Sequence, residues 1–165
     1  MLLQHLHTVI PDLKNAQQLI LSRWMQKFCV VTFLHEYDIK PEYFINHFAV
    51  RIISNGLAMV EDSLEESDFY VTKELLDEFR DKEINPYDIF RIYKAMKEVC
   101  VELISEGDIL SAEFLFNRDK IIIDFYRFFE GLTEGVLFYY AQEYYHNEGA
   151  INAELFKPLE RQKVL

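Results

Sequence analysis

Residues 121–146 read IIIDFYRFFEGLTEGVLFYYAQEYYH and decide the fold of this chain. They end a proline-free segment, 110–146, in which aromatic side chains gather: Phe114, Phe116, Phe125, Tyr126, Phe128, Phe129, Phe138, Tyr139, Tyr140, Tyr144 and Tyr145. A single straight helix of that length would extend ~55 Å at 1.5 Å per residue. A compact chain of this size has a radius of gyration of only ~15 Å. The segment must therefore bend, or project from the domain and meet a partner.

The composition around this segment indicates one helical domain. Of 165 residues, 50% are hydrophobic and 15% aromatic, which excludes a disordered chain and allows a sizeable core. Only 5 Gly and 4 Pro argue against a turn-rich β fold. We expect one all-α domain over residues 1–146, followed by a tail or linker over 147–165.

The net charge and the lengths of the apolar runs indicate which partners and which cellular location to expect for this protein. The balance of 28 acidic against 17 basic residues gives a net charge of −11, which repels phosphate backbones and anionic membranes and argues against nucleic-acid binding. No apolar run approaches the roughly 20 residues of a membrane span, and the first residues lack the pattern of a signal peptide. Cys29 and Cys100 lie in apolar helical stretches, as reduced, buried thiols do. We expect a soluble, cytoplasmic protein.

Proline positions and helical spacing predict the first two helices. Pro11 suits the first position of a helix, and one apolar face follows it: Leu13, Ala16, Ile20, Trp24, Phe28 and Val31. A strand over 28–34 is the competing prediction, because that run is rich in β-branched and aromatic residues. After a turn at 36–40, Pro41 begins a second helix with its own apolar stripe: Ile45, Ala49, Ile52, Ile53, Gly56, Val60 and Leu64.

The second half of the chain carries clearer helix boundaries. A short, charged helix over 69–82 has three residues on its buried side: Leu75, Leu76 and Phe79. Asn85 is an N-cap before Pro86, and Gly107 closes that helix as a left-handed residue. Asp108 is then placed to cap the final long helix. The result is about five main helices in a bundle or a globin-like arrangement.

No catalytic or cofactor motif declares itself. A haem iron needs an axial imidazole, and the helix over 69–82, which precedes the last two, carries none. His35 and His47 come early in the chain, although His47 lies one turn from Phe44 and could face the interior. A di-metal site needs two Glu-x-x-His pairs, and only one occurs, at 143–146. We expect no metal, no cofactor and no enzymatic activity; a haem- or metal-binding sensor using His47 or His35 is the alternative.

Two glycines interrupt the aromatic segment. Gly131 and Gly135 are four residues apart, so they share a helix face and allow another backbone to approach closely. Each costs ~1 kcal/mol relative to alanine, which packing, a bend or a dimer contact should offset. We expect a dimer interface that comprises Gly131, Gly135, Phe138 and Tyr139. Whether the helix kinks at the glycines stays open.

The apolar stripes also suggest a ligand pocket. Seven residues from four predicted helices are its expected lining: Trp24, Phe48, Ile52, Ile92, Met96, Phe125 and Phe129. A small hydrophobic molecule would suit such a pocket. The same residues equally suit an ordinary core.

The chain resembles the N-terminal sensory domain of RsbR-type stressosome proteins, the bacterial non-haem globin-like group. Three runs and the closing helix carry the resemblance: LILSRW at 19–24, LLDEFR at 75–80, PYDIFRIY at 86–93, and residues 125–145. The resemblance covers about residues 12–146. It implies a bacterial, globin-like helical domain without haem that dimerises through its terminal helices and passes a signal to a downstream protein or output domain.

These observations combine into one functional hypothesis and a second alternative. We expect a non-enzymatic sensory or regulatory domain that acts through homodimerisation. A small hydrophobic ligand in the apolar pocket is compatible with this role. The second alternative is a protein-interaction adaptor that uses the acidic stretches 61–68 and 74–83. The signal and the downstream partner are not encoded in any motif.

Overall fold

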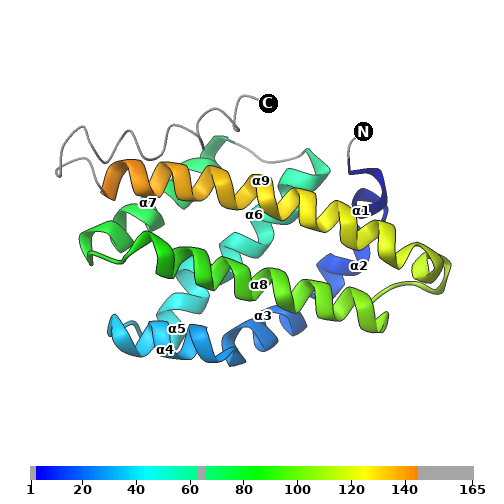
Figure 1. The fold of residues 1–165 in the computed structure, drawn as a ribbon, viewed down its shortest axis with the longest axis horizontal. Helices are drawn as coiled ribbons and strands as arrows, with labels where there is room; N and C mark the ends of the chain where they lie inside the picture. The colour runs from blue at the N-terminus through cyan, green and yellow to red at the C-terminus, as the bar shows by residue number, and fades with distance from the viewer. Residues whose placement is uncertain (1–2, 63–65, 145–165) are drawn as a thin grey trace.

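Every element of the computed structural model, which describes residues 3–62 and 66–144, is helical, as the composition predicted (Figure 1). The α-helices are α1 (Gln4–Thr8), α2 (Ile10–Asn15), α3 (Gln17–Gln26), α4 (Phe28–Glu36), α5 (Pro41–Phe44), α6 (Val50–Glu61), α7 (Glu66–Asp81), α8 (Pro86–Glu106) and α9 (Arg118–Tyr144). A π-helix, η1 (Ile45–Ala49), joins α5 to α6, and a 3₁₀ helix, η2 (Ala112–Asn117), precedes α9. The expected five helices are thus divided more finely. The expected tail, 147–165, lies outside the described residues.

Helix α8 lies at the centre of the arrangement. In Figure 1 it runs between α9 on one side and α3 with α4 on the other, and it packs against all three. Helix α6 crosses behind this layer and contacts α1, α2, α3 and α7. The core therefore lies between the α3–α4, α8 and α9 layer and the helices behind it.

The ends of α8 are where the sequence predicted them. The side chain of Asn85 accepts a hydrogen bond of 2.8 Å from the backbone N–H of Tyr87, which caps the helix at Pro86. Gly107 adopts a left-handed φ of 79° and its N–H donates to the carbonyl of Leu103 at 3.2 Å. Capping at both ends gives α8 a defined length of 21 residues.

The prediction of one continuous first helix is wrong, because the structure divides it into α2, α3 and α4. The chain bends at Ala16 and again at Lys27, whose ψ of 133° is extended and ends the α-helical hydrogen bonding. The face up to Trp24 is buried as predicted, but the second bend shifts the helical phase. Phe28 is consequently 82% exposed and Val31 52% exposed. In their place α4 buries Val30, Phe33 and Leu34. The segment over 28–34 is helical, so the competing strand does not form.

The middle of the chain follows the predicted pattern closely. Helix α4 ends at Glu36 and α5 begins at Pro41. The predicted stripe of the second helix is buried from Ala49 onward, whereas Ile45 is only partly buried and Leu64 lies outside the described residues. Helix α7 begins before the predicted boundary and buries its three expected residues: Leu75, Leu76 and Phe79.

The start of the final helix is a second correction. A loop and η2 follow Gly107, so α9 begins at Arg118 and Asp108 does not cap it. The proline-free segment therefore bends before residue 118. From there α9 is one α-helix that continues through Gly131 and Gly135 without interruption. The short α1, which the sequence did not predict, packs against this helix.

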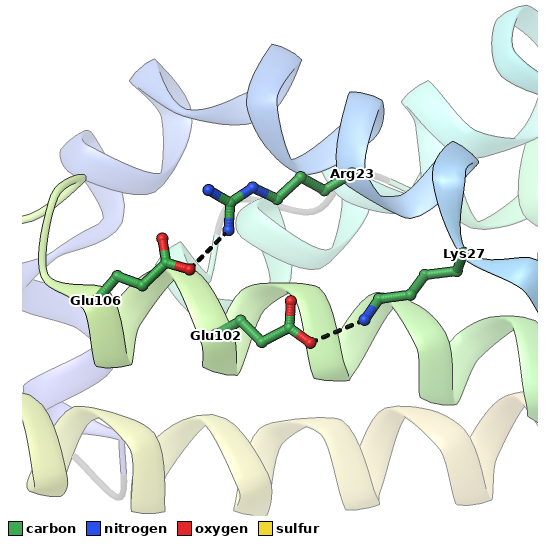
Figure 2. Close-up of polar contacts among 4 residues, drawn as sticks. All are labelled: Arg23, Lys27, Glu102 and Glu106. Atoms are coloured by element: carbon green, nitrogen blue, oxygen red, sulfur yellow. Dashed lines mark hydrogen bonds and ion pairs between the residues drawn. The ribbon is translucent and has the colours of Figure 1, made fainter.

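Helix α3 is held to α8 by a buried hydrogen bond and two surface ion pairs. The indole N–H of Trp24, which has no exposed surface, donates to the carbonyl of Ile92 at 2.8 Å. Arg23 pairs with Glu106 at 3.0 Å and Lys27 with Glu102 at 2.8 Å, as Figure 2 shows. The hydrogen bond to Glu102 raises the pKa of Lys27. These contacts fix the register of α3 on α8.

Two buried tyrosines of this core predict opposite effects of losing a hydroxyl. The hydroxyl of Tyr93 has no hydrogen-bond partner among the described residues, whereas that of Tyr140 donates to the carbonyl of Ile84. Tyr93→Phe should raise the free energy of unfolding by about 1 kcal/mol, because it removes a buried unpaired group. Tyr140→Phe should lower it by about 1–2 kcal/mol. Urea denaturation of both variants measures the difference, and a destabilised Tyr93→Phe protein would contradict the packing described here.

Tyr93 also predicts how the stability of the protein depends on pH. Burial raises the pKa of Tyr93 far above its usual range, so above pH ~10 the unfolded chain loses a proton that the folded chain keeps. Stability must then fall as pH rises, by up to about 1.4 kcal/mol per pH unit from this group. Tyr93→Phe should show a shallower loss between pH 10 and 11 than the unsubstituted protein. Equal slopes would mean that Tyr93 ionises in the folded state.

Candidate functional site

A groove runs along the outer surface where α8 and α9 lie side by side. Its volume is about 430 Å³, which is within the range of ligand and peptide sites. The floor is apolar and comes from both helices: Phe90, Tyr126, Phe129 and Leu137. We call this feature the α8–α9 groove.

The two walls of the α8–α9 groove carry opposite charges. Helix α8 contributes Lys94 and Lys97, and α9 contributes Glu130 and Glu134. The Nζ atom of Lys97 lies 5.1 Å from the ring centre of Tyr126 and so makes a cation–π contact there. Lys94, Glu130 and Glu134 form no ion pair within the described part of the chain. A basic row therefore faces an acidic row without neutralising it.

Thr133 lies between the two glutamates at the base of the groove. It is 6% exposed, and its hydroxyl has no hydrogen-bond partner among residues 3–62 and 66–144. A buried hydroxyl without a partner is unfavourable by about 1–3 kcal/mol. Within the described residues, the site thus contains a buried unpaired hydroxyl as well as charges without an ion-pair partner.

A second, smaller pocket lies between α6 and α9, and Leu6 of α1 forms part of its wall. Its volume is about 40 Å³, and side chains from α1, α2, α3, α6, α8 and α9 surround it. Every lining residue is apolar, and they include Leu6, Gly56, Met96, Cys100 and Phe128. We call it the inner cavity. A water molecule there would find no hydrogen-bonding side chain.

The seven residues of the predicted pocket fall into three places. Ile52, Met96 and Phe125 line the inner cavity, while Phe129 lines the α8–α9 groove. The other three are packed in the core, as their contacts show: Trp24 with Phe44, Phe48 with Phe79, and Ile92 with the indole of Trp24. The sequence predicted which residues are buried more successfully than which of them meet.

The residues of the predicted dimer interface do not share one environment. Gly131 is exposed, and a side chain added there would meet nothing within 4 Å. Tyr139 is turned toward α7, where its hydroxyl donates to Asp77 at 3.1 Å and Lys73 lies over its ring. Gly135 and Phe138 are half-buried. Gly131 therefore lies on the open surface of α9, which also includes Ile123 and Tyr126.

The histidines considered as metal or haem ligands lie on the surface. His47 is exposed and stacks on Tyr43 with a ring separation of 4.3 Å, so the expectation that it could face the interior is wrong. His35 is exposed as well. In the part of the chain that the structure describes, no three His, Cys, Asp or Glu side chains converge as a metal site would require. The side chains of Glu143 and His146 fall outside that part.

Of the residues that line the α8–α9 groove, sequence reasoning assigned only Phe129 to a site, and it missed all four charged ones. Lys94 and Lys97 are three residues apart, and Glu130 and Glu134 are four apart, so each pair shares a helix face. That spacing is the signal available in the sequence. It gains meaning only once α8 is known to lie antiparallel beside α9.

In comparison with known proteins, no family model, no curated protein and no solved structure matches the chain. The resemblance to the RsbR-type sensory domains, and with it the globin-like arrangement, stays a prediction. Among the helices of the described residues, none combines the length and the apolar character needed to cross a membrane.

The two cysteines provide a chemical test of this interior. Cys100 lines the inner cavity, and burial raises the pKa of its thiol to about 12, whereas Cys29 is half-buried. Only the thiolate reacts with a disulfide reagent. At pH 8 we expect one thiol to react with Ellman's reagent in the folded protein and a second only after unfolding.

A Cys29→Ser variant is the control for this test. It should show no reaction until denaturant is added. Rapid modification of Cys100 in the folded variant would contradict the burial of this thiol.

Proposed function

We propose that this chain is a non-catalytic regulatory domain that works as a homodimer, with the α8–α9 groove of each copy forming the interface. The observation that carries the proposal is the self-complementary charge of the groove. A symmetric dimer buries the same surface on both partners, so such a surface must complement itself. A basic row beside an acidic row meets this requirement.

The geometry of the symmetry axis follows from the two rows. A two-fold axis that runs along the groove, in the plane of the interface, places α8 of one copy over α9 of the other. Lys94 then lies over Glu130 and Glu134 of the second copy, and the reverse contact occurs by symmetry. An axis across the groove would instead bring like charges together, which is unfavourable.

The apolar floor of the groove and the exposed Gly131 also favour a second copy of the chain as the partner. Closing two grooves on each other removes Phe90, Leu137 and the 47% exposed Tyr126 from water, which favours association. Gly131 leaves space on the exposed face of α9 for a second helix to approach. The regulatory role itself rests on the resemblance carried by residues 75–80 and 86–93.

Charge reversal tests the interface directly. Sedimentation should find a dimer for the unsubstituted protein and a dimer weakened at least about tenfold, or ~1.4 kcal/mol, for Lys94→Glu and for Glu130→Lys alone. Each reversal acts twice across the two-fold axis. The double variant Lys94→Glu/Glu130→Lys should recover the dimer, because the exchanged charges again oppose each other.

Lys120→Glu is the matched control, since Lys120 is an exposed residue of α9 outside the groove lining. It should leave the dimer unchanged. A monomer at micromolar concentration would overturn the homodimer. If the dimer affinity is the same in all three groove variants as in the unsubstituted protein, the interface lies elsewhere.

A further inference from the structure

The inner cavity differs from the α8–α9 groove in position and chemistry. It lies on the opposite side of α9, where Phe125, Phe128 and Leu132 face α6 and the short N-terminal helices. Its volume of about 40 Å³ is roughly three times what one water molecule occupies. Its walls carry no polar side chain, so filling it with water is unfavourable.

Gly56 keeps part of this cavity open. It lies inside α6, has no left-handed φ, and is buried. A Cβ atom there would lie 3.8 Å from Cζ of Phe128, an ordinary van der Waals contact. Alanine would therefore fit, and it is the better helix former. Because the backbone does not need a glycine here, the local effect of Gly56 is the space it leaves.

The short helix α1 forms one wall of the cavity. Leu6 of α1 lines the cavity and is almost fully buried. The carboxylate of Asp124, itself 4% exposed, accepts hydrogen bonds from the backbone N–H groups of His5 at 2.9 Å and Leu6 at 3.1 Å. One carboxylate of α9 thus holds α1 in place. A helix of five residues is unstable by itself, so α1 depends on these contacts with α9.

From the apolar walls and the space beside Gly56, we infer that the inner cavity binds a nonpolar molecule of two or three heavy atoms. Such a molecule needs no hydrogen bonds and gains dispersion contacts with the surrounding side chains. Its chemical class is a nonpolar diatomic gas or a light hydrocarbon. The inference is independent of the proposed dimer, because it uses none of the groove residues.

Xenon is a suitable probe, since it is nonpolar and of comparable size. Titrating the intact protein with dissolved xenon should shift the methyl resonances of Leu6, Ile52 and Leu132 saturably in NMR spectra. Gly56→Ala should weaken xenon binding at least about fivefold, because the added methyl occupies part of the cavity. Absence of saturable shifts in the unsubstituted protein would overturn the site.

Ser54→Ala is the control for Gly56→Ala. Ser54 is an exposed residue of the same helix and lies outside the cavity lining, and alanine improves the helix propensity at both positions. The Ser54→Ala protein should bind xenon as the unsubstituted protein does. Equal binding by the Gly56→Ala protein would show that xenon occupies another place, and weaker binding by the control would show an effect unrelated to the cavity.

Discussion

The packing of α8 between α9 and the α3–α4 pair is the constraint on which the rest of this structure depends. Helix α8 is capped at both ends, so local hydrogen bonds define where it begins and ends. The buried hydrogen bond from Trp24 to the carbonyl of Ile92 fixes α3 on one side of it. On the other side α9 lies along most of its length (Figure 1). Both the groove and the inner cavity follow from where α9 lies relative to α8.

Helix α9 contributes to two different surfaces because its apolar residues surround more than one face. One side carries Phe125 and Phe128 toward the inner cavity, and the next carries Tyr126 and Phe129 toward the groove. A helix that is apolar on most sides is normally buried on most sides. Here α8, α7 and α1 cover parts of α9, and the side around Gly131 stays open.

Buried polar groups on α9 have contrasting surroundings. Asp124 is buried with its hydrogen bonds made, and it holds the N-terminal helix in place. Thr133 is buried with its hydroxyl unpaired in the described structure. Stable domains rarely leave such groups without partners, and those that do occur call for an explanation. The part of α9 around Asp124 therefore stabilises the fold, whereas the part around Thr133 borders the groove.

The sequence by itself determined the helical class, the boundaries of α8 and the buried side of α7. These depend on neighbours a few residues away: Asn85 caps its own helix, and Gly107 ends it through its own φ. The bend at Lys27 escaped prediction because apolar spacing continued across it, and only packing on α8 selected the new phase.

Tertiary structure alone decided which residues meet. It separated the seven predicted pocket residues into cavity, groove and core, turned Tyr139 toward α7, and brought Lys94 opposite Glu130 and Glu134. The physical reason is that helical periodicity reports which face of a helix is apolar, but not which other helix covers it. That choice is made by the packing of all the helices together.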